Sequence, residues 1–472
     1  MGYSFSLPTE LTGPKRPQIR LKNFPTMTPR NLAWYINKLL IKAGSRRVFM
    51  HKEVMHRRYA WLHVVAAVVL LVSVSPLSCF SDEQAAIEQE IVKEEAEGDY
   101  ETLLPSLGRE YLREHGLNLE VIAINDSWGN VRGGNERGVG SLGNMNVILQ
   151  ADTEKLGLWG NGSFTFWGIW IYGQRPSDAV GDYQFTSSID GPQELEPYEA
   201  YYEHSFLDGR ITWLAGIHDF SLDFAILDYG LTFINSSLFT PSTITQVPYS
   251  FFPNTSWGTR GVFKTSEETY AMLGFYDGKP ISNNGINTID FSVTEQDGLY
   301  SIGEVGLKGV SPSGHHRKVA FGAWHCSGEF SDISGLNAHS NYGTYLVGEH
   351  ELWKEVDGSD QGFGAFAQVA QAQPGRNLNS WYYGGGLRYK GLVPDRDDDI
   401  VGVGFALAQF SDEAREANPD LESNEHTYEI SYRAPLNGWL TVTPDAQFVV
   451  NPGGNPDRAN DLILYVRSEI TL

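Results

Sequence analysis

The sequence predicts an all-β fold: a sixteen-stranded antiparallel transmembrane β-barrel with short periplasmic turns and long external loops. First, segments of roughly nine to fifteen residues with alternating polar and apolar side chains recur from residue 121 to the end of the chain. Second, short and long connections alternate between these segments. Third, the chain is rich in Gly (50), Tyr (23), Phe (24) and Trp (12), and no long amphipathic helical pattern follows residue 118.

The amino-terminal part of the chain carries targeting features and precedes the predicted barrel. Residues 1–54 form a basic extension that is unusual before an export signal, and we expect that translation starts at Met50 or Met55 and that the residues upstream of that start are not translated. Residues 55–81 have the three parts of a secretory signal peptide: a basic pair, the apolar run 60–74, and small residues after it. The run is too short for a comfortable transmembrane helix. We therefore predict an exported protein.

The predicted signal peptide also bears on the two cysteines and on the acidic segment that follows it. Cleavage near Cys79 leaves Cys326 as the single thiol, which excludes an intrachain disulfide. A lipid anchor at Cys79 is the less favoured alternative, because Pro76 stands where a branched apolar residue is expected. Residues 82–118 are predicted to be an acidic helical periplasmic segment, with a plug or an oligomerisation arm as the alternative. The barrel is predicted to span 119–472.

Sixteen segments have the period-two pattern of strands. In 142–153, for example, Val147 and Leu149 alternate with Asn146 and Gln150, so one face is apolar and the other polar. The predicted strands are 121–130, 142–153, 158–172, 197–206, 210–219, 258–266, 269–277, 299–308, 316–327, 342–353, 360–371, 379–389, 398–410, 425–434, 438–449 and 461–472.

The connections between these strands differ at the two ends of the predicted sheet. They are short after the second, fourth, sixth, tenth and fourteenth strands, and long after the first, third, fifth, seventh, ninth, thirteenth and fifteenth. This asymmetry is typical of an outer-membrane barrel. A soluble propeller would instead show a repeat of roughly 40 to 50 residues, which the sequence lacks.

Charged side chains keep to one face of the predicted strands. In the last strand Leu464 and Val466 alternate with Tyr465, Arg467 and Glu469. A packed soluble barrel would have to bury such charges unpaired, at a cost of several kcal/mol each. We therefore expect a water-filled lumen in which they stay solvated.

The stretch 198–258 has the most distinctive sequence. By alternation, Tyr198, Tyr202, Trp213 and Ile217 are expected to face lipid, and the charged residues of the same strands to face water. The loop that follows is the longest after an odd-numbered strand, and we expect it to fold inward and narrow the lumen. Packing on the rim of the barrel is the alternative.

Three passages resemble a known family: YEAYYEHSFLDGRITWLAGIHDFSLDFAILDYGLTFINSS, SFFPNTSWGTRGVFKTSEETYAMLGFYDGKP and, near the end, TPDAQFVVNPGG. In this order they are similar to the bacterial carbohydrate-selective porins of the OprB family, from about Gly116 to Leu472. The resemblance implies a sixteen-stranded outer-membrane barrel that passes sugars by diffusion. The chain departs from the family in ending on Leu472 where an aromatic residue is common, and in its acidic segment before the barrel.

Candidate substrate-binding residues come from the strands and loop of this stretch. Opposite charges across a narrow pore offer donors and acceptors to sugar hydroxyls, and aromatic rings stack on a sugar face. The alternative is that these side chains are ion pairs that only hold strand register. The candidates are Glu199, Tyr201, Glu203, Arg210, His218, Asp223, Asp228, Asn235, Trp257, Arg260 and Lys264.

We predict an outer-membrane porin for carbohydrates that is not an enzyme and uses no cofactor or metal. His315, His316 and His325 have no partners at metal-ligand spacing. The alternatives are a general or cation-preferring porin, suggested by the net charge of −23, and a secreted all-β carbohydrate-binding protein or glycosidase. The same charge excludes nucleic acid as a partner. Sugars and outer-membrane lipid are the expected partners, and the outward faces are compatible with a monomer or a homo-oligomer.

Overall fold

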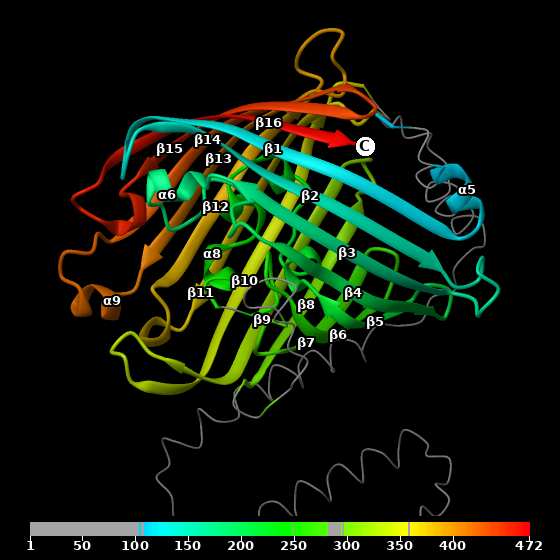
Figure 1. Cartoon of the computed structure of the whole chain (residues 1–472), viewed down its shortest axis with the longest axis horizontal. Coiled ribbons are helices and arrows are strands. Elements are labelled where there is room, and N and C mark those ends of the chain that lie inside the picture. The colour runs from blue at the N-terminus through cyan, green and yellow to red at the C-terminus, as the bar shows by residue number, and fades with distance from the viewer. Residues whose placement is uncertain (1–102, 105–107, 248, 282–293, 295–296, 357–358) are drawn as a thin grey trace, which may run out of the picture. The chain divides into compact units, whose positions relative to one another are not determined.

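The computed structural model describes residues 103–104, 108–247, 249–281, 294, 297–356 and 359–472. The predicted extension 1–54, the predicted signal peptide 55–81 and most of the acidic segment lie outside the described residues. The described part forms a closed barrel in which each strand pairs with its neighbours in sequence and β1 pairs with β16 (Figure 1). The predicted fold class is therefore confirmed.

All sixteen predicted strands are present, and each pair is antiparallel. Closure joins the first and last strands, with Ala123 opposite Ile470 and Trp128 opposite Tyr465. The strands are β1 Leu117–Gly134, β2 Gly138–Asp152, β3 Gly162–Gly173, β4 Leu195–Phe206, β5 Ile211–His218, β6 Ser256–Lys264, β7 Thr269–Asp277, β8 Leu299–Val310, β9 His316–Ser331, β10 Asn337–Lys354, β11 Gly362–Ala372, β12 Asn379–Lys390, β13 Ile400–Phe410, β14 Asn424–Asn437, β15 Leu440–Val450 and β16 Ala459–Thr471.

The helices of the described part are short and lie in the connections. No helix there has the length and apolar character needed to cross a bilayer. Helix α5 falls within the predicted acidic segment, and the others follow the barrel strands. They are α5 Arg109–Glu114, α6 Pro176–Val180, α7 Ser236–Phe239, α8 Ser242–Thr245 and α9 Asp412–Ala417, with the 3₁₀ segments η2 Phe220–Leu222, η3 Gly230–Thr232, η5 Pro374–Arg376 and η6 Pro452–Gly454.

Long and short connections gather at opposite ends of the barrel, as predicted for most of them. The connections 174–194, 219–255 and 278–298 follow odd-numbered strands, whereas 207–210 and 438–439 follow even-numbered ones. The prediction of long connections after the first and ninth strands is wrong. There the ladders continue, with Asn130 opposite Gly138 and Ser331 opposite Asn337, so the turns are tight.

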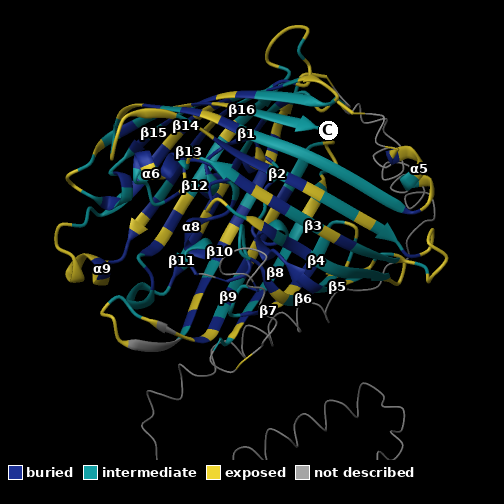
Figure 2. Ribbon diagram, viewed as in Figure 1, coloured by how far each residue is buried: buried dark blue, intermediate teal, exposed yellow. Residues whose placement is uncertain are grey.

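The outward face of the barrel is apolar. Large apolar side chains on this face are 42–55% exposed, among them Val147, Trp213, Leu346, Ile430 and Leu464. Exposed and buried residues alternate along the strands in Figure 2. Such a surface fits lipid and not water, since a soluble monomer rarely exposes so large an apolar area. The alternative of a secreted soluble β protein is therefore excluded.

The interior of the barrel differs from the expected open lumen. Connections 174–194 and 219–255 fold inside the ring of strands (Figure 1) and cover many charged side chains. Asp126, Glu425 and Glu429 are at most 2% exposed. The expectation that the lumen charges stay solvated is wrong for these residues, because loop backbone and partner side chains have replaced water around them.

Candidate functional site

Connection 219–255, named here the inward loop, starts and ends at the same place on the wall. The Phe220 N–H donates to the Ser250 carbonyl at 3.0 Å, so the two ends of the loop lie side by side. Between them η2, η3, α7 and α8 pass through the barrel interior. The contacts described below confirm that this loop folds inward and does not rest on the rim.

Buried carboxylates of distant strands hold the backbone of the inward loop. Irregular backbone inside a barrel needs partners for its N–H groups, and a carboxylate is the strongest acceptor available. The three carboxylates are at most 3% exposed. The pairs are Ala225 N with Glu304 of β8 at 2.8 Å, Tyr229 N with Glu349 of β10 at 2.8 Å, and Ile234 N and Asn235 N with Glu429 of β14 at 2.5 and 3.2 Å.

Apolar packing fixes the same loop against the wall. Phe220 and Phe224 are at most 1% exposed and belong to one cluster with Tyr276, Tyr300 and other inward-facing aromatic residues. The ring centroids of Phe220 and Tyr300 are 4.8 Å apart. Aromatic pairs of this kind add to the free energy gained by burying their area. The barrel therefore contains a hydrophobic core in addition to its aqueous space.

One charged cluster joins the start of the inward loop to strands β4, β5 and β6. It consists of Glu199, Tyr201, Glu203, His218, Asp223 and Arg260. Arg260 is its centre: its Nε lies 2.8 Å from Asp223 Oδ2 and its Nη2 lies 3.0 Å from Glu203 Oε2. His218 Nε2 lies 3.3 Å from the same oxygen of Asp223. The sequence prediction thus named six residues that the structure brings together.

Within this cluster the two acids of the Arg260 pair face the open lumen. The side chains of Glu203 and Asp223 are 32% and 23% exposed, whereas Arg260 and His218 are nearly buried at 8% and 4%. The Tyr201 ring meets the His218 ring edge-on at 5.3 Å. Glu203 also lines a polar cavity of about 320 Å³ at the turn end of the barrel, together with Asp152, Glu154, Asn161, Gly162, Ser163 and Ser205.

Four other predicted site residues lie elsewhere. Arg210 is in the exposed turn before β5 and not on the lumen wall of the strand. Trp257 is 38% exposed and, by the alternation of β6, lies on the face opposite Arg260, so it faces outward and cannot stack on a sugar in the lumen. Lys264 is exposed at the end of β6. Asn235 is fully buried and caps α7 by accepting from Ser237 N at 2.9 Å.

The expectation that Tyr198 faces lipid is also wrong. The residue is 3% exposed, and its hydroxyl donates to Asp219 Oδ2. The reason is a β-bulge: Trp167 pairs with Glu199, but Gly168 pairs with Pro197, so the alternation of β4 slips at Tyr198. A bulge depends on the neighbouring strand and could not be seen in the sequence of β4 alone.

A second polar group on the wall was missed by the sequence analysis. It consists of Asp228 of the inward loop and of the wall residues Lys308, His316, Lys318, Glu349 and Arg388, which gather around residues 226–229. Lys308 Nζ lies 3.0 Å from Asp228 Oδ2, and Lys318 Nζ donates to the Ile226 carbonyl at 2.6 Å. The Arg388 guanidinium lies 4.6 Å from the centre of the Tyr229 ring. Of the predicted residues, Asp228 belongs to this group and not to the charged cluster.

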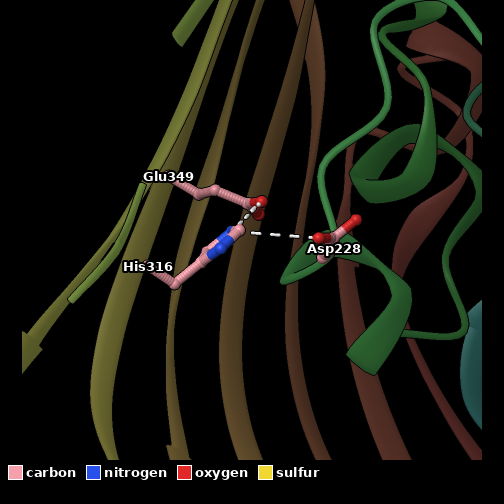
Figure 3. A group of neighbouring side chains, drawn as sticks. All are labelled: Asp228, His316 and Glu349. Atoms are coloured by element: carbon pink, nitrogen blue, oxygen red, sulfur yellow. Dashed lines mark hydrogen bonds and ion pairs between the residues drawn. The ribbon is translucent and has the colours of Figure 1, made fainter. Parts of the chain in front are cut away.

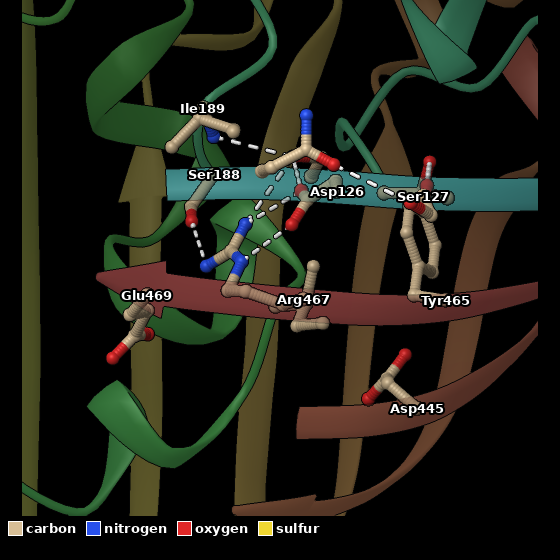
Figure 4. A network of polar contacts seen from close by, with 12 residues as sticks. Asp126, Ser127, Ser188, Ile189, Asp445, Tyr465, Arg467 and Glu469 are labelled. Carbon is tan, nitrogen blue, oxygen red and sulfur yellow. Dashed lines mark hydrogen bonds and ion pairs between the residues drawn. The ribbon is translucent and has the colours of Figure 1, made fainter. Parts of the chain in front are cut away.

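A buried ion pair on the barrel wall helps to anchor the second inward loop, 174–194 (Figure 4). Arg467 of β16 donates from Nε and Nη2 to the two oxygens of Asp126 in β1, at 2.7 and 2.8 Å. Ser187 and Ser188 of the loop complete the network, with Ser187 Oγ 2.6 Å from Asp126 and Ser188 Oγ 3.1 Å from Arg467. The side chains of Arg467 and Asp126 are 8% and 0% exposed.

Asp219, the first residue of the inward loop, is fully buried, and its carboxylate accepts hydrogen bonds from uncharged donors. Burial raises the pKa of this carboxyl to about 6, although Tyr198 and the N–H groups of Ser221 and Phe252 donate to it. The folded protein therefore binds this proton more tightly than the unfolded chain does. Its contribution to stability is full below about pH 4, falls as pH rises to about 6, and stays low above that.

Replacing Asp219 by Asn should flatten this pH dependence. Between pH 4 and pH 7 the wild-type loss of unfolding free energy should exceed that of Asp219→Asn by about 3 kcal/mol. The measurement is urea unfolding of the detergent-folded barrel at both pH values. Asp412→Asn is the control, because the Asp412 side chain is 87% exposed. Equal pH dependence in wild type and Asp219→Asn would refute the assignment.

Comparison with known proteins agrees with the barrel fold. A family model described as "Carbohydrate-selective porin, OprB family" matches residues 136–472. Porin B of Pseudomonas aeruginosa is 21% identical over 252 residues, which are 46% of this chain and 55% of that protein. The chain thus spans about half the length of this curated relative.

Two solved structures share the fold. The high-pH structure of Pseudomonas putida OprB has a TM-score of 0.71 and 19% identity, and covers 78% of this chain and 97% of that chain. The low-pH structure of the same protein has a TM-score of 0.54 and 15% identity, with 79% and 98% covered. The family and the apolar outward face of the barrel indicate the bacterial outer membrane. The chain belongs to the OprB family of carbohydrate-selective porins.

Proposed function

We propose that this chain is a passive channel for sugars, whose lumen is narrowed by the inward loop. The observation that carries the proposal is a pair of carboxylates, Asp223 and Asp228, whose side chains are 23% and 40% exposed on an otherwise largely buried segment of the inward loop. Asp223 lies against Arg260 in the charged cluster, and Asp228 lies against Lys308 in the second polar group. A solute that passes this segment therefore meets hydrogen-bond acceptors and donors in the charged cluster and again in the second polar group.

Such a surface suits an uncharged, polyhydroxylated solute. Sugar hydroxyls both donate and accept hydrogen bonds, so they can bridge an exposed carboxylate and its cationic partner. Glu203 and Asp223 would accept from the solute, and Arg260 would donate to it. Binding that is weak and spread over several groups allows the solute to enter and also to leave. Transport then needs no covalent chemistry, and we propose no enzymatic activity.

We also propose a role for each part of the chain. Residues 55–81 would direct export, and 82–118 would remain in the periplasm, while sugars and outer-membrane lipid are the partners of 119–472. The apolar outward face also fits contact with further copies of the chain, as in a homo-oligomer.

A cation-preferring general porin is the competing function, because the chain has a net charge of −23. Planar-bilayer conductance distinguishes the two. A sugar porin should lose conductance when glucose or a glucose oligosaccharide is added, because the bound sugar occupies the lumen. Free passage of small cations with no block by either sugar would favour the general porin.

Arg260→Gln should change both properties. It leaves Glu203 and Asp223 without their cation, so the ratio of K⁺ to Cl⁻ permeability should rise several-fold and the sugar block should weaken. The reversal potential in a KCl gradient and a glucose titration of the conductance measure the two effects. Arg415→Gln is the matched control, because Arg415 pairs with exposed Asp412 outside the lumen. Unchanged ion ratio and unchanged block in Arg260→Gln would remove this residue from the selectivity region.

A further inference from the structure

Three potential metal ligands meet where the inward loop touches the wall. Asp228 comes from the loop, His316 from the first position of β9 and Glu349 from β10 (Figure 3). One ligand atom from each residue lies within 4.8 Å of the other two. His316 Nε2 is 2.9 Å from Glu349 Oε1 and 3.8 Å from Asp228 Oδ2.

Neighbouring groups orient these ligands. The second oxygen of Glu349 accepts from Tyr229 N at 2.8 Å, which leaves Oε1 to point at the histidine. The His316 backbone N–H donates to Glu351 Oε2 at 3.0 Å, and the His316 ring lies 5.7 Å from the Tyr229 ring. Outer contacts of this kind raise metal affinity, because they hold the ligands in place before the ion arrives.

The site is open on one side. The Glu349 side chain is fully buried, whereas those of His316 and Asp228 are 26% and 40% exposed. An ion can therefore enter from the lumen and keep water as a further ligand. Sequence spacing gave no sign of this site, because the three residues come from a loop and two strands that meet only in the closed barrel.

We infer that Asp228, His316 and Glu349 bind a divalent transition metal ion, for which Zn²⁺ is the natural probe. Zn²⁺ accepts imidazole nitrogen, carboxylate oxygen and water as ligands, whereas Mg²⁺ and Ca²⁺ prefer oxygen ligands alone. The charge of the ion balances the two carboxylates. Bound metal links the inward loop to the barrel wall. This inference does not depend on which solute the channel passes.

Lys308 is the internal competitor for this site. Its ammonium group lies 3.0 Å from Asp228 Oδ2 and neutralises a carboxylate that the metal would use. Removing this positive charge should therefore strengthen metal binding, whereas a site that consists only of ion pairs would gain no affinity for Zn²⁺. Lys308→Gln should therefore raise the affinity for Zn²⁺, whereas substitution of a ligand residue should lower it.

The experiment is calorimetric titration of the tag-free, detergent-folded protein with ZnCl₂, with bound zinc counted by atomic absorption after dialysis. Wild type should bind one ion at this site. His316→Gln and Glu349→Gln should each weaken binding by about tenfold or more, and Lys308→Gln should tighten it. His426→Gln is the control, because His426 alternates with inward-facing Glu425 on β14 and lies on the outward face. Excess Mg²⁺ should not displace the zinc.

A second readout covers the case in which a ligand variant folds poorly. Zn²⁺ should raise the temperature at which the folded band is lost on a heat-modifiability gel, for wild type and His426→Gln but not for Asp228→Asn. Asp228 is a loop residue, so its substitution leaves the strands intact. The inference is overturned if wild type binds no zinc, or if the His316 and Glu349 variants bind it as tightly as wild type. Sugar flux is measured separately, so either result leaves the proposed function untouched.

Discussion

Arg467→Met is expected to lower the free energy of unfolding by about 3–5 kcal/mol. Arg467 and Asp126 are 8% and 0% exposed, and two hydrogen bonds of 2.7 and 2.8 Å join them. Removing the cation leaves the buried Asp126 carboxylate without compensation, which costs far more than the loss of the attraction alone. Ser188 would also lose its hydrogen bond from Arg467, while Ser187 keeps its hydrogen bond to Asp126, so the second inward loop should loosen around Ser188. Urea unfolding of the detergent-folded barrel measures the change.

A nearby ion pair provides the matched control. Arg433 of β14 lies 2.7 Å from Glu469 of β16 on the same inward face, but these side chains are 32% and 28% exposed. Arg433→Met should therefore cost only about 0–1 kcal/mol. The double variant Arg467→Met, Asp126→Asn should recover part of the loss, because it removes the uncompensated charge. Equal costs for Arg467→Met and Arg433→Met would contradict the importance of burial here.

Shortening the inward loop is expected to have the largest effect on conduction. The Phe220 N–H and the Ser250 carbonyl are 3.0 Å apart, so a short Gly-Ser linker can replace residues 222–248 without moving β5 or β6. Removal of this segment takes the loop backbone and its packed aromatic side chains out of the lumen. Single-channel conductance should rise several-fold, and discrimination between small and large sugars should be lost, because the lumen would then be limited by the wall alone.

The control for this variant is a connection that lies outside the barrel. Replacing the exposed α9 segment, Asp412–Ala417, by a linker should leave conductance unchanged. A heat-modifiable band on a denaturing gel confirms that each variant has a folded barrel. Wild-type conductance in a folded variant without residues 222–248 would show that the inward loop does not limit flow.

The fold could be predicted from the sequence because its main signal is local. Apolar and polar side chains alternate within each strand, as Leu464 and Val466 do with Tyr465 and Arg467. Every strand shows this pattern because one of its faces contacts lipid. All sixteen strands could be found in this way. Two of the three passages that resemble the family, and the long loop that was expected to fold inward, lie within residues 198–280. The charged cluster around Arg260 could also be predicted, since β4, β5 and β6 are consecutive.

The features that sequence analysis missed arise where a loop folds inward onto strands that are distant in the chain. Asp228, His316 and Glu349 are far apart in the chain and meet only because the inward loop crosses to β9 and β10. The burial of Asp126 and Glu429 was missed for the same reason, since the loops that cover them belong to other strands. Trp257 was predicted to face the lumen because it is aromatic, although the alternation of β6 places it on the outward face.

The central claim is that the barrel passes sugars through a lumen narrowed by the inward loop. The most direct test is swelling of liposomes that contain the purified protein, in isotonic solutions of a monosaccharide and of a trisaccharide. We predict rapid swelling in glucose and much slower swelling in raffinose, because the inward loop limits the size of the solute. Swelling in glucose no faster than in protein-free liposomes would contradict the claim.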